Sequence, residues 1–117
     1  MKFTDSHEWV KDDGTVGITD HAQKELGDIV YVQLPPIGTH VVAGREAAVL
    51  ESTKAAADIY APVSGRVVAV NDALKDNPSL LNADPENAGW LFQVEIETPE
   101  QLQKLLTKEQ YSGLLQR

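Results

Sequence analysis

Residues 42–70, VAGREAAVLESTKAAADIYAPVSGRVVAV, carry a short internal repeat at the centre of the chain. Residues 42–49 and residues 63–70 each place a Gly-Arg pair before an apolar, strand-like run. A repeat this short can arise by chance, but a true duplication would indicate two β-rich halves related by an approximate two-fold axis. Between the two copies, a hairpin would have Thr53 and Lys54 near its tip, although this turn lacks the Asn-Gly or Gly-X pair of tight hairpins.

The residues before the repeat alternate between short apolar runs and turn residues, which is typical of a β-rich domain. A first hairpin is expected from residues 8–11 and 15–18, joined by an Asp-Asp-Gly turn. Asp20 can cap a short helix that Gly27 closes, and a strand over residues 29–34 ends at two prolines.

After the repeat, the chain becomes polar and then ends in helices. Residues 71–89 contain Asn-Pro and Asp-Pro pairs and predict a loop with one helical turn, whereas the alternating residues 90–96 predict a last strand. Thr98 and Thr107 each open a capping-box pattern ahead of a leucine-containing segment. We therefore predict a mainly β (α+β) fold with short helices and a helical C-terminus.

The size and composition of the chain predict a single folded domain over residues 1–117. With 117 residues, 42% hydrophobic and 24% charged, the chain has ordinary globular composition and no room for a second domain. It has no cysteine, which excludes disulfides and thiolate chemistry of its own. Its apolar runs are too short to span a membrane, so we expect a cytoplasmic bacterial protein or a mature protein of the mitochondrial matrix.

The charge of the chain favours basic partners. Asp and Glu number 18 against 10 Lys and Arg, which gives a formal net charge of -8. This excess repels phosphate backbones and anionic lipids, so neither nucleic acid nor a membrane is an expected partner. Basic protein surfaces are better candidates, and we expect the chain itself to be a monomer.

No catalytic motif of the chain's own stands out. The sequence has no Gly-rich phosphate loop, nucleophile elbow or zinc-binding pattern, and His7, His21 and His40 lie in separate turns or strand ends. We interpret these three histidines as structural or solvated. Three alanines follow Lys54 and leave its side chain unobstructed, but an exposed lysine alone indicates no function.

The segment around Lys54 nevertheless resembles the lipoylation segment of glycine cleavage H proteins. In residues 51–65, ESTKAAADIYAPVSG, a glutamate stands three positions before the lysine and a glycine eleven after it. The resemblance extends over nearly the whole chain, in order and at family-like spacing. Its other parts are SHEWV at 6–10, VGITDHAQ at 16–23, LGDIV at 26–30, Asn71, DNP at 76–78 and GW at 89–90.

The resemblance implies a barrel-sandwich hybrid, in which two antiparallel sheets have pseudo-two-fold symmetry and the modified lysine lies on a hairpin tip. Lys54 would carry lipoate in amide linkage, an arm on the order of 14 Å long by covalent dimensions. Glu51 and Gly65 would serve in recognition by the lipoylating enzyme. Thr53 and Ala57 depart from the valine and serine that are usual in the family, and both departures bear on that recognition.

The same resemblance implies a carrier of the glycine cleavage system rather than an enzyme. Its arm would take an aminomethyl group from glycine decarboxylase (P protein) to aminomethyltransferase (T protein) and electrons to dihydrolipoamide dehydrogenase (L protein). A lipoate ligase or a lipoyl or octanoyl transferase would load the arm. Ser6, Glu8 and Asp58 match positions that line the family's arm-binding cleft, where charge-assisted hydrogen bonds would hold the aminomethyl group.

Three other interpretations stay open at the level of sequence. The first is a lipoyl or biotinyl domain from a different complex, but biotinyl domains usually have methionine on both sides of the lysine, where this chain has Thr53 and Ala55. His7-Glu8-Trp9 and the two C-terminal helices also favour the H-protein pattern. A lipoyl donor that passes its group to other lipoylated complexes would share every feature described above. The third interpretation is a binding domain whose lysine is never modified.

Overall fold

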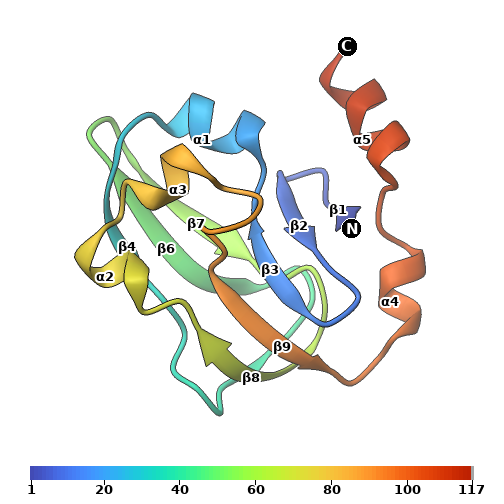
Figure 1. Cartoon of the computed structure of the whole chain (residues 1–117). Coiled ribbons are helices and arrows are strands. Elements are labelled where there is room, and N and C mark those ends of the chain that lie inside the picture. Colours follow the sequence, from blue (N-terminus) through green and yellow to red (C-terminus); the bar gives the residue numbers. More distant parts are fainter. Residues whose placement is uncertain (117) are drawn as a thin grey trace.

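Two antiparallel sheets make up most of the structure (Figure 1). The computed structural model describes residues 1–116, so Arg117, the last residue of the predicted domain, lies outside the described residues. The larger sheet has six strands, in the order β1 (Lys2–Phe3), β2 (Glu8–Val10), β3 (Thr15–Ile18), β9 (Phe92–Ile96), β8 (Gly65–Val70) and β5 (His40–Val41). The smaller sheet has three, in the order β4 (Ile29–Gln33), β6 (Glu46–Ser52) and β7 (Ala56–Tyr60).

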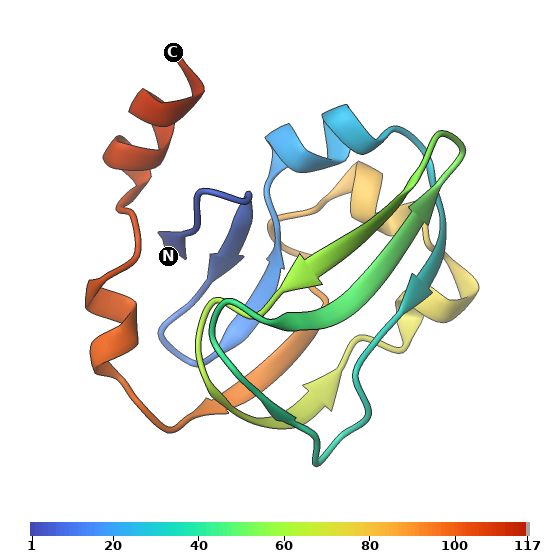
Figure 2. The same ribbon diagram turned by 180° about the vertical axis from the view of Figure 1, so that it is seen from behind.

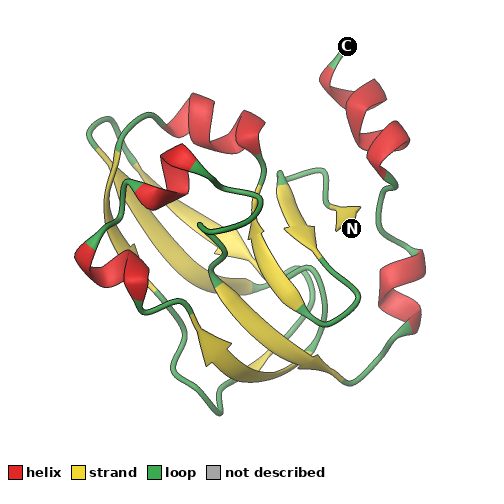
Figure 3. Ribbon diagram, in the orientation of Figure 1, coloured by secondary structure: helices red, strands yellow, loops and turns green. Residues whose placement is uncertain are grey.

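Short helices lie between some of the strands and after the last strand, β9 (Figure 3). In chain order they are α1 (Asp20–Leu26), α2 (Ala73–Asp76), α3 (Leu80–Ala83), α4 (Glu100–Gln103) and α5 (Lys108–Leu115). The predicted mainly β fold with a helical C-terminus is confirmed, but the expected loop 71–89 contains two short helices instead of one helical turn. Within residues 1–116, none of these helices is both long and apolar enough to cross a membrane.

The two copies of the internal repeat lie in different sheets. The strand of the first copy is β6, in the smaller sheet, and that of the second is β8, in the larger sheet. Over the described residues the strand order gives two separate sheets rather than one closed barrel, as expected for a barrel-sandwich hybrid. From behind, the tip of the β6–β7 hairpin lies at one end of the molecule, next to the loop after α1 (Figure 2).

Side chains from both sheets and from the short helices share one core. Alternation buries Phe92 and Val94 of β9 on the same face, as the pattern of residues 90–96 predicted. Leu74 of α2 and Leu81 of α3 are fully buried and hold this otherwise polar stretch against the sheets. Burying one such side chain contributes roughly 2 kcal/mol, which explains why the stretch folds as helices and not as an open loop.

The C-terminal segment closes over the first strand of the chain. Phe3 and Leu106 exchange two backbone hydrogen bonds of 2.9 and 2.8 Å, and the Phe3 ring stacks on Tyr111 with ring centroids 4.8 Å apart. The hydroxyl of Tyr111 lies 2.7 Å from the Thr19 hydroxyl and 2.8 Å from Nδ1 of His7. These contacts tie α5 to β1 and to the start of α1.

The capping box at α5 is confirmed, whereas the one predicted from Thr98 is wrong. The Thr107 hydroxyl accepts the amide of Gln110, and the Gln110 side chain accepts the amide of Thr107. In α4, Pro99 occupies the N-cap position and no side chain caps the helix. A helix of four residues is held by its packing rather than by its ends.

The cap of α1 also differs from the prediction by one residue. The hydroxyl of Thr19, not the carboxylate of Asp20, accepts the Ala22 amide, at 3.3 Å. Asp20 is the first helical residue, where its negative charge interacts favourably with the positive end of the helix dipole. The predicted closure is confirmed, because the Gly27 amide donates to the carbonyl of Gln23 at 3.0 Å.

Gly65 begins β8 where neighbouring strands approach each other closely. It pairs with Val41 of β5 and with Ile96 of β9. A Cβ atom at this position would lie 2.0 Å from the carbonyl oxygen of Glu95 and 2.6 Å from Cγ1 of Val94. A larger residue would therefore push β9 away from β8.

We predict that Gly65→Ala lowers the free energy of unfolding by about 1–3 kcal/mol, the usual cost of overpacking a close contact. Urea denaturation followed by circular dichroism measures this change. Gly113→Ala is the control, because its added Cβ would meet no heavy atom within 4 Å and alanine favours the helix. An unchanged midpoint for Gly65→Ala would contradict the close-contact argument.

Candidate functional site

The tip of the β6–β7 hairpin is closed by a serine side chain. The Ser52 hydroxyl accepts the amides of Lys54 and Ala55, both at 3.1 Å, and the Ser52 amide donates to the Ala55 carbonyl at 2.8 Å. These side-chain hydrogen bonds stabilise a turn that lacks the Asn-Gly pair of tighter hairpins. The predicted position of Lys54 at the tip is confirmed.

Beyond the last β4–β6 strand pair, Ile29 and Ser52, a backbone hydrogen bond joins the tip to the rest of the molecule. The Thr53 amide donates to the Asp28 carbonyl at 3.0 Å, in the turn that joins α1 to β4. Lys54 itself is exposed, and it makes no ion pair with any of residues 1–116. The tip therefore presents a primary amine that another protein can reach.

Glu51 and Gly65, the two residues expected to matter for lipoylation, lie in different places. Glu51 is exposed on β6, opposite Tyr31 of β4 and Ala56 of β7, and so close to the tip. Gly65 is the first residue of β8, a strand that lies at the end of the molecule away from the hairpin tip (Figure 1). Its contacts with β9 give it a role in packing at that end.

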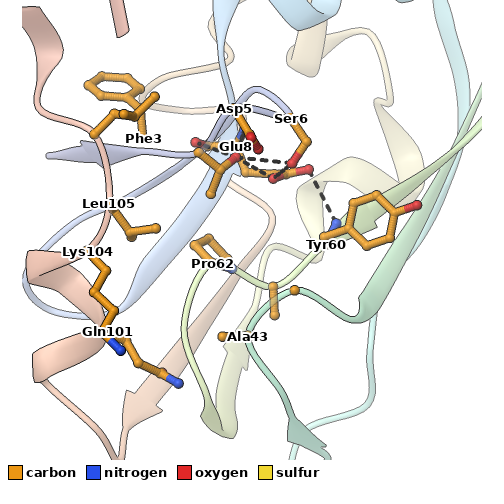
Figure 4. Close-up of a pocket in the computed structure, with 14 residues that line it drawn as sticks. Phe3, Asp5, Ser6, Glu8, Ala43, Tyr60, Pro62, Gln101, Lys104 and Leu105 are labelled. Atoms are coloured by element: carbon orange, nitrogen blue, oxygen red, sulfur yellow. Dashed lines mark hydrogen bonds between the residues drawn. The ribbon is translucent and has the colours of Figure 1, made fainter. Parts of the chain in front are cut away.

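A second polar feature is a cavity of about 470 Å³ beside β2 (Figure 4). Its floor contains Glu8, whose side chain is 1% exposed. One carboxylate oxygen of Glu8 accepts the hydroxyls of Thr4 and Ser6, the latter at 2.6 Å. The other oxygen accepts the backbone amide of Tyr60 at 3.3 Å. Two hydroxyls and one amide thus hold a buried carboxyl group in a fixed orientation.

The electrostatics of this cavity favour a cation. Burial raises the pKa of the Glu8 carboxyl above its ordinary value, and the hydrogen bonds from Ser6, Thr4 and the Tyr60 amide oppose this only in part. Lys104 also lines the cavity, but within residues 1–116 no basic group forms an ion pair with Glu8. A positively charged ligand would supply the missing countercharge.

Of the three residues predicted to hold an aminomethyl group, the structure brings two together. Ser6 and Glu8 are hydrogen bonded in the cavity, whereas Asp58 is exposed on β7 and lines a separate hollow that also includes Glu46. Asp58 and Tyr60 alternate with the buried Ile59, so they share the outer face of β7. Asp58 therefore lies along the strand between Lys54 and the cavity.

Two partners of Glu8 escaped the sequence analysis. Thr4 stands four residues before Glu8, and its hydroxyl reaches back because the chain turns between β1 and β2. The amide of Tyr60 comes from the other sheet and gives no local signal. The one sequence signal for these contacts was the alternation of Thr4, Ser6 and Glu8, which places two hydroxyl residues ahead of the glutamate.

The three histidines lie outside both features. His7 contacts the Tyr111 hydroxyl, His21 pairs with Glu25, and His40 Nε2 lies 2.8 Å from Glu97. Burial and the neighbouring His21 lower the pKa of His7. Over the described residues, no group of three possible metal ligands comes together.

Comparison with known proteins places the chain in a family. The model of the family described as "Glycine cleavage H-protein" matches residues 1–117. The chain belongs to this family. A glycine cleavage system H protein of Deinococcus deserti is 59% identical over 96 residues, which cover 82% of this chain and 80% of the relative. One of Legionella pneumophila is 54% identical over 116 residues, which cover 97% and 93%.

A solved structure agrees with this assignment. The crystal structure of a glycine cleavage system H protein from Mycobacterium marinum superposes with a TM-score of 0.90 at 40% sequence identity. The match covers 99% of this chain and 96% of the other. Both the family and its fold, two antiparallel sheets with short helices, therefore agree with the resemblance read from the sequence.

We predict that Glu8 makes the H-protein fold less stable as pH rises. The pKa of Glu8 is raised in the folded state, so between its ordinary value of 4.5 and the folded value the folded state holds the extra proton and loses stability with increasing pH. As pH rises from 4.5 to the folded-state pKa, the unfolding free energy of the wild type should therefore fall relative to that of Glu8→Gln.

Denaturant unfolding at a series of pH values measures this difference. Glu95→Gln, which changes an exposed glutamate of β9, serves as the control and should show no such trend. A wild-type protein that gains stability relative to Glu8→Gln as pH rises would contradict the assigned sign.

Proposed function

We propose that the chain, residues 1–117, is the lipoylated carrier of a glycine cleavage system. The observation that carries this proposal is the exposed amine of Lys54, held at a closed hairpin tip in a member of the H-protein family. Lipoate in amide linkage at Lys54 supplies a sulfur pair that accepts an aminomethyl group and electrons. The polypeptide presents, orients and shelters this group, and it has no catalytic role of its own.

The proposed partners are enzymes that take turns at one arm. They are glycine decarboxylase, aminomethyltransferase and dihydrolipoamide dehydrogenase, together with a lipoate ligase or a lipoyl or octanoyl transferase that loads Lys54. A net charge of -8 favours encounter with basic surfaces around their active sites. Because the reported relatives are bacterial, we propose that these encounters take place in the cytoplasm of a bacterium.

The cavity at Glu8 supports a holding role between encounters. A neutral aminomethyl group can use its nitrogen lone pair to expel the sulfur, whereas an ammonium group has no lone pair to use. Glu8 is a buried carboxyl without a basic partner within residues 1–116, so a neighbouring ammonium group would lower its pKa and be stabilised in return.

The outer face of β7 supports a path from Lys54 to this cavity. Ala56, Asp58 and Tyr60 are exposed at alternate positions, in that order from the tip. Four residues of extended strand, the separation of Lys54 and Asp58, span at most about 14 Å, so an arm of that length reaches Asp58. We propose that Asp58 attracts the ammonium group there, and that Ser6 and Glu8, in the cavity that Tyr60 lines further along the same strand, hold it when it enters.

We predict that co-expression with a lipoate ligase adds one lipoyl group to the wild type and none to Lys54→Arg, because a guanidinium cannot be acylated by the same chemistry. Intact mass and peptide mapping measure the increment and its position. Lys24→Arg is the matched control, since Lys24 is also exposed on a neighbouring helix. A lipoyl group on another lysine, or none on the wild type, would refute the proposed attachment.

We predict that Glu8→Gln and Asp58→Asn release formaldehyde from the loaded protein faster than the wild type. Losing one hydrogen bond between charged groups changes an equilibrium by about tenfold or more, and we expect an effect on the order of tenfold for Glu8→Gln and a smaller one for the exposed Asp58. Glu95→Gln is the control. Loading by glycine decarboxylase followed by formaldehyde detection gives the rates, and equal rates for all four proteins would rule out the holding role.

A further inference from the structure

The side chain of Lys54 lies against the bare backbone of Gly27. A Cβ atom at Gly27 would lie 2.8 Å from Cε of Lys54 and 3.4 Å from its Nζ. The aliphatic part of the lysine thus occupies the space that any side chain at position 27 would need. Gly27 also has φ +83°, a conformation that residues with a side chain rarely adopt.

An asparagine of α3, Asn82, forms hydrogen bonds with the α1–β4 turn that Lys54 contacts. Nδ2 of Asn82 donates to the carbonyl of Gly27 at 2.9 Å and to Oε1 of Gln23 at 3.0 Å. Oδ1 of Asn82 accepts the amide of Ile29 at 2.9 Å. One side chain therefore holds the α1–β4 turn on both sides of Asp28, at Gly27 and at Ile29.

The hairpin tip also forms a hydrogen bond with this turn. The Thr53 amide donates to the Asp28 carbonyl, one residue along from Gly27. Lys54 follows Thr53 directly, so the origin of its side chain is fixed relative to the backbone over which that side chain lies. The lysine is exposed to solvent and yet restricted on one side.

We propose that Gly27 and Asn82 are positioning residues for acylation of Lys54. The proposal rests on the proposed function, and it adds how this chain directs its amine toward the enzyme that loads it. In acylation from a lipoyl adenylate, the Nζ lone pair attacks the acyl carbon, the bond from that carbon to the phosphate oxygen breaks, AMP leaves and the amine loses a proton. A lysine already aligned along the turn loses less rotamer freedom when this attack geometry forms.

A purely structural role for Gly27 is the rival explanation, because glycine often closes helices. The two explanations differ in what they do to acylation kinetics. Loss of a helix cap lowers stability, whereas loss of alignment lowers kcat and leaves KM for the carrier unchanged, since the docking surface stays intact. Gly38→Ala is the matched control: Gly38 has φ +93°, and a Cβ there would meet nothing within 4 Å.

The experiment measures steady-state lipoylation of the unmodified full chain by a purified lipoate ligase with ATP and lipoate. We expect Gly27→Ala to lower kcat about tenfold at constant KM, and Asn82→Ala, which leaves Gly27 in place, to lower it about threefold. Gly38→Ala should keep the wild-type kcat. In the labelled wild type before loading, an NOE between the Lys54 Hε and Gly27 Hα protons is expected, and Asn82→Ala should weaken it.

The results distinguish failure of the positioning role from failure of the proposed carrier function. Wild-type kcat in both Gly27→Ala and Asn82→Ala, or no NOE between Lys54 and Gly27, overturns the positioning role and leaves the carrier function standing. A wild type that the ligase does not load overturns the carrier function and the positioning role with it. If Gly27→Ala does not fold, the kinetics and NOE of Asn82→Ala alone support or overturn the positioning role.

Discussion

The hydrogen bond from the Thr53 amide to the Asp28 carbonyl is the constraint on which the functional surface depends. Without it, the β6–β7 hairpin would be joined to the α1–β4 turn only through the strand pairing that ends at Ile29 and Ser52. With it, the smaller sheet, the end of α1 and the α3 asparagine form one support under a single lysine. The origin of the lysine side chain is thereby fixed relative to the turn, while its amine stays exposed to solvent.

The cavity at Glu8 differs from the hairpin tip because its charged group is buried rather than exposed. Glu8 is buried, and burying a carboxyl that lacks a basic partner costs stability even when three donors satisfy its oxygens. The fold retains this group at the expense of stability, which supports the holding role proposed for Glu8. The two sites also come from different parts of the architecture: Lys54 belongs to the three-stranded sheet, and Glu8 to the six-stranded one. The Tyr60 amide connects them, because it belongs to the strand that begins at the tip and binds the Glu8 carboxylate.

Local patterns predicted most elements, whereas long-range contacts escaped them. The repeat around residues 42–70 located the hairpin and its lysine, and alternation located β9, because both depend on neighbouring residues. The wrong cap at Thr98 shows that a capping pattern does not ensure a cap, because Pro99 and not Thr98 occupies the N-cap position of α4. Local sequence patterns gave no reason to single out Glu8, and only the family resemblance identified it as a candidate site residue. Gly27 and Asn82 are 55 residues apart, and no periodicity relates them.

The closure of the C-terminal segment over Phe3 has a consequence for the order in which the protein matures on the ribosome. The hairpin and the turn that supports it lie before residue 61, apart from Asn82. One wall of the Glu8 cavity, by contrast, contains Gln101, Leu105 and Leu106, which are synthesised after the hairpin. A nascent chain can therefore display its lysine while the Glu8 cavity still lacks this wall, which residues 101–106 complete once they are translated.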